Sequence, residues 1–384
     1  MSFGSMNAGK ADYALPSAPS DGVSDITFSP TGNLITAGSW DNGVRVWELQ
    51  RGYGTQSITA VPKAQINHDA PVLCTDFSAD GTKVFSGGAS KQARALRILF
   101  SVACVFSVVQ VNMWSLGQPG TTGQQIGVHD AAVKTVRFIP EMNLVASASW
   151  DRTVKFWDTR TSTPAAVVTL CERAYSMDTR GAMMVVATAD RKICVYNLGS
   201  WSANGPAPQT MTDSPLRYQT RCVSIFPDQQ GFAVGSIEGR VGIEYFSEQA
   251  AKQQAASGYK PATTYGNTKL SFAFKCHRVT GTQSSVYSVN SIAFHKYGTF
   301  ATAGSDGNFH FWDKDSRQRL KAYDLKQGNT ISVCKFSPDG GLFGYAMSYD
   351  WSQGVEHANP QATNNIFVHA VADDEIKPRP KDKK

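Results

Sequence analysis

The sequence lacks the paired cysteines, long apolar runs and signal segments that define several common protein classes. Its seven cysteines are scattered singly, and no two have C-x-x-C spacing, so we expect no metal site and a reducing compartment. The one marked apolar run, 98–109, is too short to cross a bilayer, which needs about 20 residues. Residues 1–20 contain no apolar h-region. We therefore expect no signal peptide and no membrane insertion.

Charge and catalytic signatures are also scarce. Asp, Glu, Lys and Arg make up only 18% of the chain, and the net charge of +6 makes an anionic partner plausible without requiring one. The sequence has no nucleophile elbow, no phosphate-binding loop and no H-E-x-x-H motif. We therefore expect no catalytic residue and no cofactor, and a non-enzymatic protein.

What the sequence does contain is a repeated unit of short alternating segments. The most complete copy is 147–158, in which Asp151 precedes Trp157 by six residues and His129 lies 22 residues before Asp151. Apolar residues alternate between the acid and the tryptophan, which predicts a strand. Seven imperfect copies of about 40–60 residues follow one another along the chain. Self-similarity at such a period predicts stacked repeats.

The second copy departs most from this pattern. His68 lies 22 residues before Ser90, but Trp114 follows Ser90 by 24 residues rather than six. Removing 93–110, an anomalous insertion, restores the six-residue spacing. The insertion has none of the Gly, Pro, Asn or Asp residues typical of a surface loop. It is interpreted as a partner-binding segment, a membrane-dipping segment, or a retained intron or gene-model error. The restored spacing favours the last.

The Ser-x-Ser-Trp-Asp and Trp-Asp pattern resembles the WD-repeat family. The resemblance implies an all-β fold, a seven-bladed WD-repeat β-propeller with four antiparallel strands per blade. We expect a flexible N-terminal segment at 1–22, the propeller at 23–371 and a basic C-terminal tail at 372–384. We also expect a strand near Tyr13 to join the seventh blade, because closing the ring removes exposed strand edges.

In WD-repeat blades a histidine, a serine or threonine, an aspartate and a tryptophan form a hydrogen-bonded set. The resemblance therefore implies a structural role, rather than a catalytic one, for the matching residues. These are His129, Ser147 or Ser149, Asp151 and Trp157, together with Asp41, Trp47, Asp306 and Trp312 of other copies.

Several sequence segments indicate which group of WD-repeat proteins this chain resembles. The segments 38–48, 235–246, 274–278, 304–315 and 349–354 resemble mRNA export factors of the nuclear pore, of the Rae/Gle type. The related Bub-type propellers of the mitotic checkpoint share the Glu-Gly-Arg-Val and Phe-Lys-Cys-His-Arg blocks. The Asp-Trp-Ser-x-Gly loop and the basic ending favour the export factors.

The resemblance implies an adaptor that supports mRNA export. Its expected partners are the GLEBS-type hairpin of an FG nucleoporin and mRNA-protein particles or single-stranded RNA. We expect it in the nucleus and at the nuclear pore, with cytoplasmic shuttling. The alternative is a spindle or checkpoint adaptor that binds checkpoint kinases through a similar hairpin. The implied hairpin-binding residues are Arg240, Phe272, Phe274, Lys275, His277, Arg278 and Lys314. Alternatively, Phe272 and Phe274 belong to a core strand and the basic residues are ordinary surface.

Sequencing the mature transcript tests the origin of 93–110. If the insertion is a retained intron or a gene-model error, the message will join the codon of residue 92 directly to that of residue 111. A message that retains the intervening codons would contradict this interpretation and leave the two functional ones.

Overall fold

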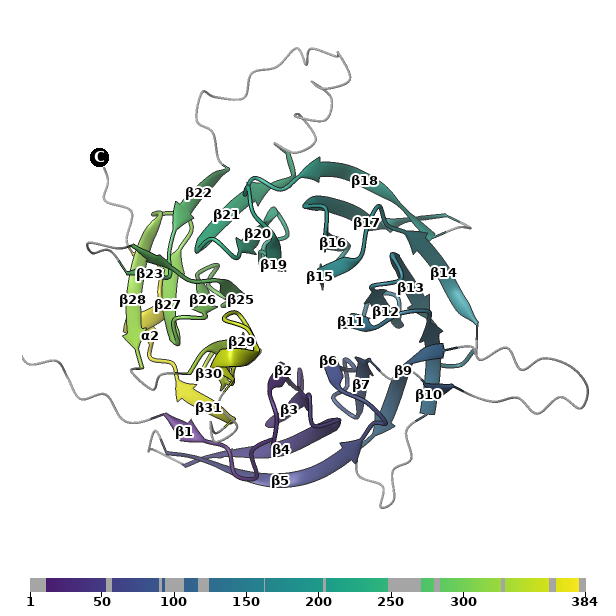
Figure 1. Ribbon diagram of the computed structural model, residues 1–384, viewed down its shortest axis with the longest axis horizontal. Coiled ribbons are helices and arrows are strands. Elements are labelled where there is room, and N and C mark those ends of the chain that lie inside the picture. The colour runs from purple at the N-terminus through teal and green to yellow at the C-terminus, as the bar shows by residue number, and fades with distance from the viewer. Residues whose placement is uncertain are drawn as a thin grey trace, which may run out of the picture.

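The alternating segments form strands that assemble as seven antiparallel sheets around a central channel (Figure 1). The computed structural model describes residues 12–52, 57–89, 92–93, 107–116, 124–161, 163–202, 205–247, 271–279, 284–325, 329–358 and 364–379. Each sheet has one edge strand at the channel and the opposite edge strand at the rim (Figure 1). The predicted all-β, seven-bladed propeller with four antiparallel strands per blade is confirmed.

Blades one to three follow one another in chain order, from the innermost strand of each blade outward. Blade one holds β2 (Val23–Phe28), β3 (Leu34–Ser39), β4 (Gly43–Arg51) and β5 (Ile58–Asn67). Blade two holds β6 (Val72–Phe77), β7 (Lys83–Gly88), β9 (Ser107–Ser115) and β10 (Gln124–His129), and β8 (Gln92–Ala93) pairs with β9. Blade three holds β11 (Val133–Ile139), β12 (Leu144–Ser149), β13 (Thr153–Trp157) and β14 (Pro164–Thr169).

The remaining blades continue around the ring. Blade four holds β15 (Ala174–Arg180), β16 (Met183–Thr188), β17 (Lys192–Ser202) and β18 (Gly205–Asp213). Blade five holds β19 (Thr220–Ile225), β20 (Gly231–Ser236), β21 (Arg240–Tyr245) and β22 (Phe272–Lys275). Blade six holds β25 (Val289–Phe294), β26 (Phe300–Gly304), β27 (Asn308–Asp313) and β28 (Gln318–Asp324). Blade seven holds β29 (Ile331–Phe336), β30 (Leu342–Met347), β31 (Asn365–Ala370) and β1 (Tyr13–Ala14).

Four further short elements of the described residues lie outside the blades. β23 (Arg278–Val279) pairs with β24 (Ser285–Val286), η1 (Val355–His357) is a single 3₁₀ turn, and α2 (Asp373–Ile376) is one helical turn.

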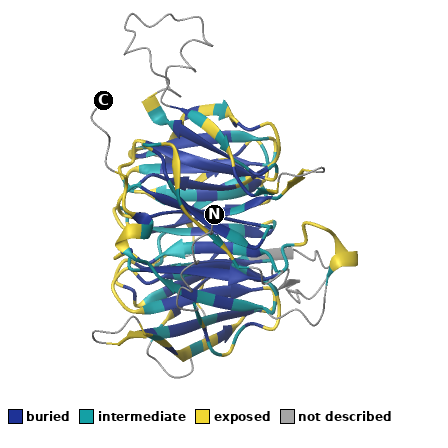
Figure 2. Ribbon diagram, turned by 90° about the vertical axis from the view of Figure 1, so that its left-hand side faces the viewer, coloured by how far each residue is buried: buried dark blue, intermediate teal, exposed yellow. Residues whose placement is uncertain are grey.

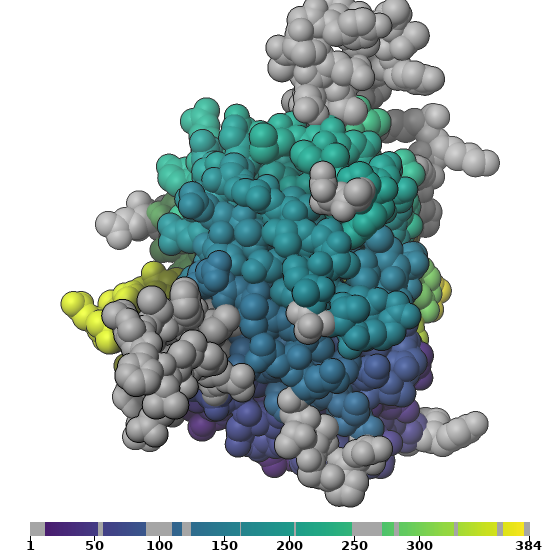
Figure 3. All heavy atoms as spheres, turned by 90° about the vertical axis from the view of Figure 1, so that its right-hand side faces the viewer, coloured from purple at the N-terminus to yellow at the C-terminus, as the bar shows by residue number. Residues whose placement is uncertain are grey.

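The core lies between adjacent blades. Every residue of β12, β20 and β30 is buried, because each blade's second strand is covered on both faces by neighbouring blades. By contrast, only Ala60 and Ile66 of the rim strand β5 are buried. Exposed residues gather at the turns of the two flat faces (Figure 2). The rim of blades two to four forms a continuous wall (Figure 3).

Side chains of the innermost strands link one blade to the next. Asp25 accepts the backbone N–H of Thr75 at 3.1 Å, and Asp76 accepts that of Phe138 at 2.7 Å. Asp178 accepts the N–H of Ile225 at 2.8 Å. These carboxylates satisfy backbone donors that face the channel and have no partner within their own sheet. The inner strands are thereby held in a fixed stagger around the ring.

The ring closes by pairing the two ends of the chain. β1 lies antiparallel to β31, with Tyr13 opposite Val368, so Tyr13 and Ala14 form the rim strand of blade seven (Figure 1). The predicted ring-closing strand near Tyr13 is confirmed. Residues 12–22, which the sequence assigns to a flexible segment, therefore include a strand of the propeller, and the blades begin at Tyr13 rather than at residue 23. Residues 1–11 lie outside the described residues.

A charged cluster locks this closure. Nδ1 of His369 lies 2.6 Å from Asp12 Oδ1, and its Nε2 lies 3.1 Å from Glu375 Oε2. Although burial opposes protonation, hydrogen bonds to the two carboxylates raise the pKa of His369 to about 9. The Tyr345 hydroxyl donates to Asp12 at 2.7 Å. The cluster thus joins a strand of blade seven to both terminal segments.

The segment after blade seven packs against the propeller. α2 lies within 372–384, the range predicted as a basic tail, and contacts β27 and β28. Ile376 is only 1% exposed and belongs to the apolar core of blades six and seven. This part of the predicted tail is therefore integrated into the fold, while 380–384 lie outside the described residues.

The strand that follows the insertion keeps the register of the other blades. In blade three Ala148 lies opposite Val154, and in blade two Gly87 lies opposite Val111. Val111 therefore occupies the place of Val154, as expected if 93–110 is additional to the repeat. β8 and β9 include Ala93 and 107–110. Residues 94–106 lie outside the described residues.

The lock between the two ends predicts a pH-dependent stability. A folded-state pKa of about 9 for His369, above the ordinary 6.5, adds stability that is complete below pH 6.5 and disappears as pH rises through 9. We expect urea denaturation to show that raising the pH from 6 to above 9 costs the wild type about 1–3 kcal/mol more than it costs His369→Gln. His357→Gln, at an exposed histidine of η1, is the control and should keep the wild-type pH dependence. Equal pH dependence in wild type and His369→Gln would refute the lock.

Candidate partner-binding face

One flat face of the propeller is built from the same turn in every blade. In each blade a backbone N–H just after the second strand donates to a carbonyl just before the first strand, as from Trp40 to Gly22, Trp150 to Ala132 and Ile237 to Gln219. These turns and the segments entering each blade therefore share one face, which we call the turn face. The turns between third and fourth strands lie on the opposite face.

The turns have a common backbone geometry. The residue after the acid has a positive φ in six blades, namely Asn42, Arg152, Arg191, Gly239, Gly307 and Trp351. In the turn of blade three, Asp151 accepts the N–H of Thr153 at 2.9 Å, which stabilises this conformation. The acid thereby points into the blade, and the residue before it is carried on the turn face.

The predicted structural set of blade three forms one hydrogen-bonded chain. Trp157 Nε1–H donates to Ser147 Oγ at 2.7 Å, and Ser147 Oγ lies 2.7 Å from His129 Nε2. His129 Nδ1 lies 2.7 Å from Asp151 Oδ2. Burial lowers the pKa of His129, so the ring is neutral, accepts from Ser147 and donates to Asp151. Ser149 lies outside this chain and donates to Ala131 O at 2.9 Å.

Blade six repeats the chain and corrects one prediction. Trp312 donates to Thr302 at 2.9 Å, Thr302 meets His277 Nε2 at 2.9 Å, and His277 Nδ1 lies 2.8 Å from Asp306. His277 is 2% exposed. It is therefore the counterpart of His129, and its assignment to a partner-binding surface was wrong.

Blades one and two use incomplete versions. In blade two Trp114 and His68 share Ser86, at 2.7 and 2.8 Å, and the Asn112 amide lies 3.5 Å from the His68 Nδ1. Burial lowers the pKa of His68 to about 4. In blade one Asp41 pairs with Arg45 at 2.7 Å, and Trp47 donates to the Pro16 carbonyl at 2.8 Å.

The turn face carries exposed apolar side chains that the sequence reading did not single out. Trp40, Trp150 and Ile237 occupy the same position, before the acid, in blades one, three and five, and each is at least 40% exposed. Trp351, at 53%, stacks near Tyr349 with ring centroids 5.5 Å apart. An alignment of the repeat copies would have drawn attention to this position, because it holds a large apolar residue in three copies beside an acid that serves the repeat.

Three of the predicted hairpin-binding residues lie together on the turn face at blade five. Arg240 begins β21, and Lys275 lies opposite it at the end of β22. The Arg278 guanidinium donates to the Glu238 carbonyl at 2.6 Å and caps the turn. Arg240 Nε lies 3.6 Å from the Glu238 carboxylate, and about a third of the Arg240 side chain is exposed. This group can still pair with an incoming carboxylate.

The other predicted residues lie elsewhere. Phe274 is half-buried and packs on Trp312, with ring centroids 4.7 Å apart, and Phe272 is half-buried beneath the Arg317 guanidinium, 4.4 Å from its ring centroid. Lys314 follows β27 on the opposite face, is 7% exposed, and pairs with Asp315 at 2.9 Å. The structure therefore does not bring Lys314 together with Arg240. The two phenylalanines border the core of blades five and six, as the core-strand alternative expects.

Exposed cations surround the apolar side chains on blades three to five. They are Arg152 of a turn, Arg173 and Arg217 of the segments entering blades four and five, Arg221 near the start of β19, and Lys275 at the end of β22. The acids of the turns, such as Asp151 and Asp306, are turned inward and hydrogen-bonded. This part of the turn face therefore presents more positive than negative charge to solvent.

Neither a metal-ligand cluster nor a helix of membrane-spanning length occurs among the described residues. Those residues contain no group of three or more His, Cys, Asp or Glu side chains placed to hold a metal ion. No helix among them has the length and apolar character needed to span a membrane.

Comparisons with known proteins agree with this architecture. The family model described as "WD domain, G-beta repeat" matches residues 13–48, 61–94, 120–158 and 270–313. The "Poly(A)+ RNA export protein" of Schizosaccharomyces pombe is 43% identical over 377 residues, covering 97% of this chain and 94% of that protein. The "mRNA export factor GLE2" of Chaetomium thermophilum is 39% identical, with 98% and 94% covered. The "mRNA export factor" of Xenopus tropicalis is 42% identical, with 96% and 92% covered.

Proposed function

The chain belongs to the WD-repeat family of mRNA export factors, and from this membership we propose that it is a non-enzymatic adaptor whose turn face binds the hairpin of an FG nucleoporin. The membership supports a role in mRNA export. The proposal adds the partner, its GLEBS-type hairpin, and residence in the nucleus and at the nuclear pore with cytoplasmic shuttling.

The observation that carries the proposal is the set of exposed tryptophans on the turn face. Trp40, Trp150 and Trp351 lie on turns whose backbone conformation is stabilised by the acids of the repeat. Their exposed rings are therefore held in fixed positions on the turn face. Rigid aromatic side chains lose little conformational entropy on binding and commonly act as anchors of protein interfaces. An extended hairpin can reach several of these blades at once.

Charge gives the hairpin its orientation. Arg240, Lys275 and Arg278 form a basic edge at blade five. Acidic side chains on the hairpin would pair with this edge, while apolar side chains meet the tryptophans. The half-buried Phe272 and Phe274 contribute mainly by supporting β22, the rim strand that carries Lys275.

The alternative partner is a checkpoint kinase that carries a similar hairpin, which would make the protein a spindle or checkpoint adaptor. The two hairpins would use the same face, so the structure of this chain alone favours neither. The names of the relatives, which refer to RNA export, favour the nucleoporin.

RNA contact is the second part of the proposed function. Arg152, Arg173 and Arg217 are exposed on the turn face and can contact phosphates without reading base sequence. Stacking of bases on Trp150 would add affinity that tolerates any sequence. Messenger ribonucleoprotein particles would thus be held weakly and without base specificity.

Substitutions on the turn face test hairpin binding. We expect Trp351→Ala to weaken binding of a labelled nucleoporin hairpin about 30-fold in fluorescence anisotropy, because an interface anchor contributes about 2 kcal/mol. Arg240→Glu should weaken it about tenfold or more, since it reverses a charge beside Glu238.

Met211→Ala is the matched control, because Met211 is 50% exposed but lies on the rim strand β18. Its affinity should equal that of the wild type. Unchanged affinity in both turn-face variants would remove this face from the nucleoporin site. Stronger binding of a checkpoint-kinase hairpin than of the nucleoporin hairpin would favour the alternative function.

A salt titration tests RNA contact. For single-stranded RNA the slope of log K against log salt is about −0.7 for each phosphate neutralised, so Arg152→Gln combined with Arg217→Gln should reduce its magnitude by about 1.4. Lys321→Gln, at an exposed position of the rim strand β28, should leave the slope unchanged. Wild-type affinity that is independent of salt would contradict phosphate contact.

A further inference from the structure

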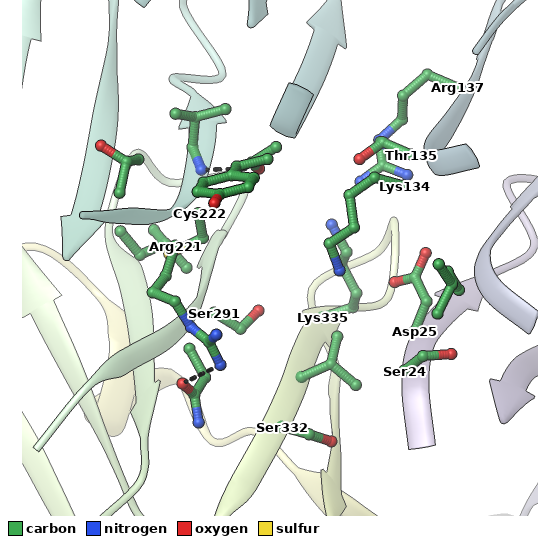
Figure 4. A pocket seen from close by; sticks show the side chains of 18 of the residues that line it. Ser24, Asp25, Lys134, Thr135, Arg137, Arg221, Cys222, Ser291, Ser332 and Lys335 are labelled. Carbon is green, nitrogen blue, oxygen red and sulfur yellow. Dashed lines mark hydrogen bonds between the residues drawn. The ribbon is translucent and has the colours of Figure 1, made fainter. Parts of the chain in front are cut away.

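The central channel widens into a cavity of about 370 Å³ that is lined by the innermost strand of every blade (Figure 4). This volume is at the lower end of those found for small-molecule sites, so a compact ligand would fill it. Trp150 of the turn face also lines the cavity, which places it near the mouth on that side. Trp150 therefore links the turn face to the mouth of the cavity.

Cations dominate the part of the cavity nearest the turn face. Lys134 and Arg221 are the second residues of β11 and β19, at equivalent places in blades three and five. The other blades place uncharged residues at this position: Ser24, Leu73, Tyr175, Asn290 and Ser332. Lys335 lies further along β29 than Ser332, deeper in the channel. The side chains of Lys134, Arg221 and Lys335 all extend into the channel (Figure 4). We call Lys134, Arg221 and Lys335 the channel cluster.

The carboxylates of the channel are already occupied. Asp25 accepts the backbone N–H groups of Ile26 and Thr75, at 3.0 and 3.1 Å. Asp178 is engaged by the fourth cation of the lining, Arg137, at 3.5 Å, and by the Ile225 N–H. These two carboxylates therefore bind backbone groups of neighbouring blades, and Asp178 also pairs with Arg137.

The three cations of the channel cluster, by contrast, form no ion pair among the described residues, although the charge of Asp25 acts on Lys134. Among the described residues, no hydrogen bond or ion pair engages the ammonium group of Lys134 or Lys335. Arg221 makes one hydrogen bond in the cavity, to the Asn290 amide oxygen at 3.3 Å. Burial, followed by the positive charge of Arg221, lowers the pKa of Lys134. Like charges that face one another in a confined space are stabilised by an anion between them.

We propose that the channel cluster binds a small multivalent oxyanion of the phosphate type, about the size of pyrophosphate. Its oxygens accept hydrogen bonds from the Lys134 and Lys335 ammonium groups and from the Arg221 guanidinium, which Asn290 holds in place. Binding draws together strands from blades three, five and seven. The ligand therefore stabilises the ring, and the three cations that hold it are separate from the side chains proposed to dock a hairpin.

Thermal unfolding and isothermal titration calorimetry with pyrophosphate test the proposal, with sodium chloride at matched ionic strength as the salt control. We expect millimolar pyrophosphate to raise the wild-type Tm more than chloride does. Lys134→Met and Lys335→Met should each weaken pyrophosphate binding about tenfold, and the double variant should abolish it. Without ligand the double variant should be at least as stable as the wild type, because it removes two uncompensated cations, so misfolding will not mimic lost binding.

Lys321→Met, on the rim strand β28, is the matched control and should bind like the wild type. The proposal is overturned if pyrophosphate stabilises the wild type no more than chloride does. It is also overturned if the double variant keeps the full effect, which would place the anion elsewhere. Stabilisation by single-stranded RNA but not by pyrophosphate would likewise overturn it, because the cavity would then serve a polymer. Hairpin binding measured on the same variants should be unchanged, which separates this result from that of the proposed function.

Discussion

The pairing of β1 with β31 is the contact on which the rest of the structure depends. In a ring of blades each sheet is covered only by its two neighbours, so an open ring would expose the apolar faces of blades one and seven together. Closing blade seven with Tyr13 and Ala14 covers both. The Asp12, His369 and Glu375 cluster adds charge-assisted hydrogen bonds at the same place. The circular stagger of the inner strands, and therefore the shape of the channel, follows from this closure.

The turn shared by the blades separates structural from interacting residues along the sequence. In the Ser-Trp-Asp run ending at Asp151 the carboxylate is bound inside the blade, while the adjacent Trp150 is exposed. Neighbouring residues in the chain thus serve opposite purposes because a left-handed residue, Arg152, follows them and fixes the direction of each side chain. The same turn conformation thus fixes a buried acid and exposes the residue before it. The exposed residue can differ from blade to blade without disturbing the core.

The sequence was sufficient for the fold and for the hydrogen-bonded chain of blade three, because both are carried by short periodic patterns. Spacing misled where the repeat is stretched: His277 lies 29 residues before Asp306, not 22, and was therefore not matched to His129. The position of Lys314 was predicted wrongly because β27 runs from one flat face of the propeller to the other. Residues that precede and follow this strand therefore lie on opposite faces. The channel cluster was missed for another reason. Its members are distant in sequence, and only closure of the ring brings their side chains together.

Blade seven also sets the order of events during synthesis. Its rim strand β1 precedes the strands of blades one to six in the chain, and its other three strands follow them. Blades one to six can form one after another as the chain emerges, since each needs only local strands. β1 must wait, unpaired, until β31 has been translated. The final step of folding is therefore the long-range capture of β1 by β31, and chaperone protection is needed most until that pairing forms.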